Sequence, residues 1–366
     1  MAALPVLHLT GTVVLDDNTT VSQVWVVDGK FSFDSPELGP GEEVIALTGT
    51  VLPGLVDVHS HIGLDAFGAT SLDTAADQAI TDRNTGVLLV RDCGSPLDTV
   101  PLQERSDLPT LIRCGQHLAR TRRYIRNYAL ELDDSAELVD ALAQQADAGN
   151  GWTKIVADWI DRAVGDLTPL WERDDLIAAI AGAHERGARV TAHTFATESI
   201  DDLLDAGIDS IEHGTGMTQA HMARAKALGV PVTATLLQVA QFAEIAAQGE
   251  AKFPVYAARM RAMFDARYAQ VKALYEAGVQ ILVGTDAGGT LAHGLIAQEC
   301  AELVRAGIPA HAVVGFASYR ARDFLGYPSI AQGAPADAVI YRGDPRADIA
   351  ELTRPLAVIL RGKIQQ

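Results

Sequence analysis

The sequence is poor in cysteine and in positive charge. Its three cysteines, Cys93, Cys114 and Cys300, are scattered and odd in number. They build neither a disulfide framework nor a zinc-ribbon spacing, so a reducing cytoplasm is the expected compartment. Against 47 aspartates and glutamates stand 29 lysines and arginines, which gives a net charge of −18. A polyanion is not attracted to nucleic acid or to an anionic membrane surface, so neither is expected as a partner.

Long apolar runs are also lacking. No run reaches the roughly 20 residues that are needed to cross a bilayer. The first residues, MAALPVLHLTGTVVLDD, have neither the basic region nor the long apolar region of a signal peptide. These absences predict a soluble protein of the cytoplasm.

The two ends of the chain share a β-type pattern. Residues 1–52 contain short runs that read as strands broken by turns, VLHLTGTVVLDD, VSQVWVVDGK and EEVIALTGT, and the closing residues add ADAVIYRGDP and PLAVILRGK. Neither end is large enough for a core of its own. We therefore predict a composite β-sandwich domain from residues 1–52 and 330–366, with residues 53–329 inserted between them.

The middle of the chain alternates buried β-type runs with amphipathic helical stretches that stop at a glycine. The strand candidates are VLPGLVDVHSH, GVLLVRDCG, TLIRCGQ, TKIVAD, RVTAHT, DSIEHG, PVTATLL and QILVGTD. Repeated β-α units of this number predict an α/β fold, a closed (β/α)8 barrel of the TIM type. The connections over residues 117–134 and 238–256 are long, and both are candidate lids over the catalytic face.

Residues able to bind metals recur where the predicted strands end. They are His59 and His61 in the first strand, Lys154 in the fourth, His193 in the fifth, His213 in the sixth and Asp286 in the eighth. Taken singly, each has an ordinary structural explanation, such as a hydrogen-bonded histidine or an aspartate that caps a helix. Their recurrence at one end of successive strands instead indicates an active site, because barrel enzymes build theirs at that end.

The motifs GLVDVHSH, TKI, AHT, IEHG and GTDAG, in this order, resemble those of the amidohydrolase superfamily. With the closing segment QGAPADAVIYRGDP, they are most similar to its imidazolonepropionase-like and Xaa-Pro dipeptidase-like branch. The resemblance implies one metal on His59, His61 and Asp286, a second on His193 and His213, and Lys154 as an N6-carboxylysine that bridges the two. Zinc suits these ligands best, and manganese, cobalt or iron are also accepted. Barrels of this branch often assemble through exposed helices, so a homo-oligomer is expected.

The implied reaction is hydrolysis of an amide-type C–N bond in a small molecule. Between two dications the pKa of a water falls toward about 7, which gives a bridging hydroxide that attacks the polarised carbonyl. Asp286 and Lys154 are then the catalytic residues, with Asp286 as general acid/base: it takes the proton and returns it to the leaving nitrogen.

The substrate is indicated less directly. The segment QHLARTRRYIRNYALEL places Arg120, Arg122, Arg123 and Arg126 beside Tyr124 and Tyr128. This is either a solvated face or a lid that grips a carboxylate, since arginine offers a bidentate fork. The second hypothesis favours a dipeptide or an N-acyl amino acid, with Arg122, Tyr124 and Tyr128 binding it.

Two further positions bear on the substrate through the resemblance. His117 matches a position where a histidine can bond the substrate, and Phe195 stands where several dipeptidase-like relatives have a tyrosine. The missing hydroxyl favours a more apolar or aromatic substrate group. Trp159 could line the same pocket or pack in the core.

Several other functions remain open. A cyclic-amide hydrolase of the imidazolonepropionase type would need one metal and no Lys154 bridge, whereas an esterase, lactonase or phosphotriesterase could use the same binuclear core. A deaminase is disfavoured, because Ala196 stands three residues after His193 and the first glutamate is Glu198. A barrel without activity and a metal-dependent decarboxylase are the more distant alternatives.

Overall fold

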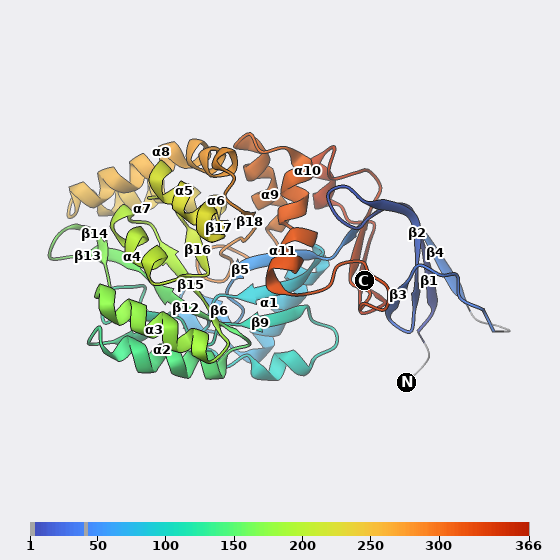
Figure 1. The fold of residues 1–366 in the computed structure, drawn as a ribbon, viewed down its shortest axis with the longest axis horizontal. Coiled ribbons are helices and arrows are strands. Elements are labelled where there is room, and N and C mark those ends of the chain that lie inside the picture. Colours follow the sequence, from blue (N-terminus) through green and yellow to red (C-terminus); the bar gives the residue numbers. More distant parts are fainter. Residues whose placement is uncertain (1–3, 40–42, 366) are drawn as a thin grey trace.

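The computed structural model describes residues 4–39 and 43–365. Residues 1–3, 40–42 and 366, which belong to the predicted β domain, lie outside the described residues. Figure 1 shows a large α/β body beside a smaller β domain that contains strands from both ends of the chain.

The smaller domain is one continuous sheet. Its strands are Val6–Val14 (β1), Thr20–Val27 (β2), Lys30–Ser32 (β3), Val44–Pro53 (β4), Ala338–Tyr341 (β19), Ala357–Leu360 (β20) and Lys363–Gln365 (β21). Across the described ranges they run in the order β21-β20-β19-β4-β1-β2-β3. Strand β4 pairs in parallel with β1 and antiparallel with β19, so it joins the two ends of the chain. Leu7, Phe31 and Ile359 are buried in the core of this domain.

The larger body is a barrel of parallel strands. These strands, counted over the described residues, are Leu55–Ser60 (β5), Val87–Asp92 (β8), Thr110–Arg113 (β9), Trp152–Val156 (β12), Arg189–Thr194 (β15), Ser210–His213 (β16), Val232–Thr233 (β17) and Ile281–Leu282 (β18). The barrel closes where the backbone N–H of Val58 donates to the carbonyl of Val283, at 3.0 Å. Each strand lies within one of the eight predicted runs to within one residue, and the predicted (β/α)8 fold is confirmed.

Helices cover the outside of the barrel. They are Leu72–Asn84 (α1), Glu137–Ala148 (α2), Arg173–Glu185 (α3), Ile200–Asp205 (α4), Gln219–Leu228 (α5), Leu236–Ala240 (α6), Phe242–Gly249 (α7), Pro254–Ala277 (α8), Ile296–Arg305 (α9), Ala310–Phe316 (α10) and Tyr319–Leu325 (α11). In α5, the Thr218 side chain caps the first turn, and Gly229 ends the helix in a left-handed conformation. Not one helix in the described part of the chain is long and apolar enough to span a membrane.

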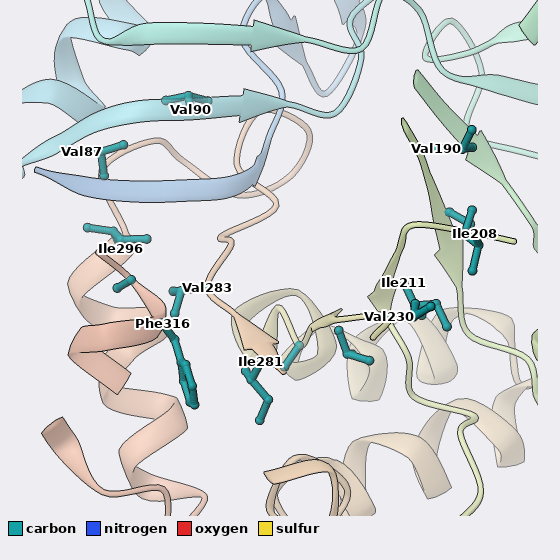
Figure 2. Packing of buried hydrophobic residues seen from close by; sticks show 14 of the residues in the cluster. Val87, Val90, Val190, Ile208, Ile211, Val230, Ile281, Val283, Ile296 and Phe316 are labelled. Atoms are coloured by element: carbon teal, nitrogen blue, oxygen red, sulfur yellow. The ribbon is translucent and has the colours of Figure 1, made fainter. Parts of the chain in front are cut away.

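The main core lies between the barrel strands and these helices. Figure 2 shows Val90 of β8, Ile211 of β16, Ile296 of α9 and Phe316 of α10 among the buried apolar side chains that fill this layer. Close packing of branched side chains around the strands holds the strand ends in fixed positions.

Insertions follow several strands at the end where the predicted ligands lie. The segment 117–134 contains two short strands, Leu118–Arg120 (β10) and Leu130–Leu132 (β11), which pair in parallel. A hairpin of Asp158–Asp161 (β13) and Asp166–Pro169 (β14) follows β12. The segment 238–256 runs through α6 and α7 into the start of α8. These connections surround the opening of the barrel.

Candidate metal centre

The six predicted ligands lie at the carboxyl ends of the barrel strands. His59 is in β5 and His61 directly follows it, Lys154 is in β12, His193 in β15, His213 at the end of β16, and Asp286 in the loop after β18. Five of them are buried, and Asp286 is partly buried, with 16% of its side chain exposed.

Four of these side chains lie close together: those of His59, His61, Lys154 and Asp286. Nε2 of His59 lies 3.1 Å from Oδ1 of Asp286 and 2.9 Å from Nζ of Lys154. Nε2 of His61 lies 3.3 Å from the same oxygen of Asp286. The structure thus brings the first, fourth and eighth strands to one point.

The other two histidines face this group from the fifth and sixth strands. Nε2 of His213 lies 3.0 Å from Nδ1 of His193. The rings of His59 and His213 are 5.1 Å apart, and His59, His213 and Asp286 each offer a ligand atom within 4.8 Å of the others. All six predicted ligands therefore form one cluster.

A left-handed backbone turns two of the ligands toward the cluster. His213 has φ 67° and Asp286 has φ 58°, values that non-glycine residues rarely adopt. Both are fixed by neighbouring groups. Nδ1 of His213 lies 2.7 Å from Oγ1 of Thr235, and the N–H of Asp286 donates to the carbonyl of His59 at 2.7 Å.

Burial keeps two of the histidines, His193 and His213, in the form that binds metals. It lowers the pKa of His213 to about 3 and holds the pKa of His193 well below its usual value. A neutral imidazole presents a lone pair, whereas an imidazolium presents none. These rings are therefore ready to act as ligands at neutral pH.

The donor set fits divalent metal ions. His213 and His193 face each other nitrogen to nitrogen, an arrangement in which at most one proton can be shared, whereas metal ions accept lone pairs from both rings. Lys154 fits only after modification, since its ammonium has no lone pair and would repel a dication. As a carbamate it would carry one negative charge shared by two oxygens, both able to act as metal ligands.

Glu212, which the sequence reasoning missed, lies behind the cluster. Its Oε2 is 2.8 Å from Nδ1 of His59, and its Oε1 contacts the guanidinium of Arg91 and the hydroxyl of Thr191. Although burial alone would raise the pKa of this carboxyl, Arg91 and His59 hold it well below its usual range. An ionised carboxylate on Nδ1 directs Nε2 of His59 into the site.

The sequence feature that could have identified Glu212 is its position in the motif IEHG, directly before His213. Strand alternation assigns neighbouring residues to opposite faces, so a glutamate beside a ligand is expected to point away. The left-handed backbone of His213 breaks this alternation, and both side chains reach His59.

Asp57 fixes the backbone of the site. Its carboxylate accepts from the N–H of His59 at 3.1 Å, and from the N–H and hydroxyl of Thr285 at 3.1 and 2.6 Å. The first and eighth strands, which carry three of the predicted ligands, are thereby tied to one side chain.

A second group of possible ligands lies on the far side of His59. His59, Cys93 and Glu212 offer atoms within 4.8 Å of one another. The guanidinium of Arg91, which contacts Glu212, places a fixed positive charge there. A cation at this position would be repelled, so we assign Glu212 and Cys93 no part as ligands.

A cavity opens above the cluster. It is lined by His61, Leu64, Tyr124, Ile125, Tyr128, Trp159, His193, Phe195, Gln238, Asp286, Gly289 and Thr290. Tyr124, Tyr128 and Phe195, which we predicted as substrate contacts, are among these residues, as is Trp159. His117 lies next to the cavity, behind His61, where Nδ1 of both rings faces the carbonyl of Gly94 at 3.3 and 2.6 Å.

The arginines of the segment 117–134 do not line this cavity. Arg122 and Arg126 are exposed, and Arg120 donates to the carbonyl of Asp133 at 2.7 Å. Arg123 donates to the carbonyls of Trp159 and Thr168, both at 3.1 Å, on the outer side of the hairpin. The structure therefore places Arg122 away from the other predicted substrate contacts.

A comparison with known families matches this arrangement to one of them. The model of the amidohydrolase family matches residues 50–365, nearly the whole chain. The chain belongs to the amidohydrolase family. As an amidohydrolase it is a metal-dependent hydrolase that acts on C–N bonds. The likeness to Xaa-Pro dipeptidases that the sequence motifs suggested also appears among solved structures.

The amidohydrolase has a curated relative that covers almost the whole chain. An uncharacterized protein of Mycobacterium tuberculosis is 47% identical over 357 residues, which are 98% of this chain and 95% of the relative. Among solved structures, a Xaa-Pro dipeptidase with bound methionine has a TM-score of 0.83 at 23% identity and covers 99% of this chain and 100% of its own. The ochratoxinase of A. niger has a TM-score of 0.81 at 18% identity, covering 99% and 96%. Both structures share the fold of this amidohydrolase.

Proposed function

We propose that this amidohydrolase holds two divalent metal ions, most suitably zinc, and hydrolyses the amide bond of a small molecule. The single observation that carries the proposal is the convergence of four histidines, one aspartate and one lysine on one point below a cavity. Four imidazoles and a carboxylate are more ligands than one ion of this kind takes from a protein. Lys154, once carboxylated, would supply a ligand shared by the two ions.

His59, His61 and Asp286 would hold one ion, and His193 and His213 the other, with Lys154 contacting both. When bound, the ions would lower the pKa of a water between them and polarise the scissile carbonyl. The chain itself supplies position: Glu212 orients His59, Thr235 orients His213, and Asp57 fixes the loop before Asp286.

Asp286 is the proposed proton carrier. It lies at the boundary between the ligand cluster and the cavity, since its Oδ1 faces His59 and His61 while its side chain lines the cavity. A carboxylate at this place can take a proton from the attacking water and deliver it to the leaving nitrogen. An amine leaves poorly without that proton, so this transfer contributes much of the rate.

The likeness to a Xaa-Pro dipeptidase supports an amide as the bond that is cut. A binuclear centre bridged by Lys154 also favours this reaction over opening of a cyclic amide at one metal. Ester, lactone or phosphotriester hydrolysis stays as the second candidate, because the same centre can perform it.

The test is a parallel assay of matched substrates. Metal-loaded protein is given a linear aryl amide, the corresponding ester and a cyclic amide, before and after a chelator and again after zinc is restored. We expect turnover of the linear amide, lost with the chelator and regained with zinc. Turnover of the ester or the cyclic amide alone would move the assignment to that reaction, and no turnover of any by metal-loaded protein would overturn it.

A further inference from the structure

The wall of the cavity is aromatic. Beyond the predicted metal ligands, the cavity is bordered by the rings of Tyr124, Tyr128, Trp159 and Phe195. Tyr124 and Trp159 meet edge to face at 4.7 Å, and Trp159 lies stacked near Phe195 at 6.0 Å with an interplanar angle of 30°. Aromatic side chains bind a flat apolar group favourably, because the contact excludes water from both surfaces.

Two of these rings are held from behind. The backbone N–H of Phe195 donates to both carboxylate oxygens of the buried Asp158, each at 3.1 Å, and its ring packs edge to face on Phe242 at 4.6 Å. Trp159, next to Asp158 in the chain, is fixed through its carbonyl by Arg123. This part of the wall is therefore preformed, and it would not rearrange to present another group.

No lysine or arginine borders the cavity among the residues that the structure describes. Beyond the predicted ligands, its neutral polar groups are the hydroxyls of Tyr124, Tyr128 and Thr290 and the amide of Gln238, in α6. Arg123 is the nearest candidate cation along the segment, and its guanidinium is engaged by Thr168, Trp159 and Asp161. A substrate carboxylate in contact with the wall would therefore have no cationic partner there.

The volume of the cavity shows that it must widen when a substrate enters. The side chains leave about 40 Å³, which is too little for an amide with two substituents. Part of the lining must therefore move to admit the substrate. Arg122 and Arg126, on the segment that carries Tyr124 and Ile125, are exposed and are not part of the lining.

We propose, on the basis of the function proposed above, that the substrate is an amide whose groups on both sides of the scissile bond are uncharged and aromatic or apolar. A carboxylate against these rings loses its hydration, and no lysine or arginine of the wall replaces it. Aromatic rings can also hold an organic cation. Here the wall stands beside a centre that would carry two dications, so a cationic group is disfavoured by repulsion.

The test uses substrates that differ by one charge. N-phenylacetyl-phenethylamine and N-phenylacetyl-phenylalanine differ only in the carboxylate of the leaving group, and a para-carboxyphenylacetyl and a para-aminomethylphenylacetyl amide place either charge on the acyl side. With metal-loaded protein we expect the neutral amide to have a kcat/KM about tenfold or more above each charged partner. Equal or better turnover of a carboxylate-bearing substrate would overturn the inference and leave the amide hydrolase intact.

A variant places the missing cation in the wall. Gln238→Arg is expected to reduce the preference for the neutral amide over N-phenylacetyl-phenylalanine by about tenfold, whereas Gln238→Met, of similar length and uncharged, should leave it unchanged. If both variants behave alike, the wall does not set the preference.

Binding separates this inference from the hydrolytic assignment. Quenching of tryptophan fluorescence in metal-loaded protein can compare N-methyl-phenylacetamide with phenylacetylglycine, and this measurement does not require turnover. We expect tighter binding of the neutral compound. If none of the amides is hydrolysed, this order of binding still decides the inference: tighter binding of phenylacetylglycine would overturn it.

Discussion

Nδ1 of His59 lies 2.8 Å from Oε2 of Glu212, on the side of the ring that faces away from the cavity. Glu212 is completely buried, and it also contacts Arg91, which is completely buried too. A buried carboxylate paired in this way is held in one orientation. Its contact with Nδ1 then fixes the orientation of the imidazole ring. The orientation of His59 in the predicted ligand cluster therefore depends on a charged pair, Glu212 and Arg91, that does not contact the substrate cavity.

Replacing Glu212 by glutamine should weaken metal binding by about tenfold to a hundredfold. Glutamine keeps the shape but no longer stabilises the proton on Nδ1 of His59 with a full charge. Competition against a fluorescent chelator measures the affinity, and circular dichroism checks the fold. Glu185→Gln, on the exposed end of α3, is the control. Equal affinities in the three proteins would show that Glu212 has no influence on the site.

Asp286→Asn should lower kcat by about a hundredfold to ten-thousandfold. Asparagine can still offer one oxygen to a metal but cannot carry a proton at neutral pH. The loss should be greater for an alkylamine leaving group than for a nitroaniline, which departs without full protonation. A loss of the same size for both would restrict Asp286 to the role of a ligand.

Arg123→Ala and Arg122→Ala separate two roles for the arginines of the segment 117–134. Loss of Arg123 removes hydrogen bonds to Trp159 and Thr168 and should loosen the aromatic wall, so KM for a neutral amide should rise severalfold. Arg122 is exposed, and its loss should leave both kinetic constants unchanged. A rise in KM for carboxylate-bearing substrates alone in Arg122→Ala would instead restore the carboxylate-gripping lid.

Glu299 makes stability depend on pH. Burial raises the pKa of this carboxyl to about 8, although it accepts from the N–H groups of Leu236 and Leu237 at 2.6 and 2.9 Å. The folded protein therefore keeps a proton that the unfolded chain releases above its ordinary pKa of 4.5. This contribution is fully present below that value and is lost as the pH rises toward 8.

In Glu299→Gln this dependence should disappear. Relative to the variant, the free energy of unfolding of the original protein should fall by about 1.4 kcal/mol per pH unit within that window. Urea unfolding of both proteins at several pH values measures the difference. Glu185→Gln should follow the original protein. Parallel curves for Glu299→Gln would mean that Glu299 ionises in the folded protein as it does in the unfolded chain.

The sequence was sufficient to predict the barrel and the six residues of the cluster. Each barrel strand is a short buried run bounded by turn residues, and His59, His193 or Asp286 is found where its run predicts a strand end. Local patterns of this kind survive folding, since the (β/α)8 fold places all such ends on one face.

Other parts of the site depend on tertiary contacts that no local pattern encodes. Glu212 follows strand alternation in the sequence but meets His59 through the left-handed backbone of His213. The arginine-rich segment left open a solvated face or a lid, and only the fold shows that Arg123 donates to the carbonyls of Trp159 and Thr168 in the β13–β14 hairpin. Gln238 comes from a helix far along the chain, and only the closed barrel brings it to the cavity.

The bridge at Lys154 is the central claim, and metal content tests it most directly. Protein grown with zinc and bicarbonate is compared with Lys154→Ala by elemental mass spectrometry, with the exposed Lys226→Ala as the control. We expect about two metals per chain in the original protein and the control, and about one or fewer in Lys154→Ala. Added acetate, which can occupy the place of the carbamate, should restore part of the loss. Equal metal content in all three proteins would contradict the account and leave Lys154 a structural residue.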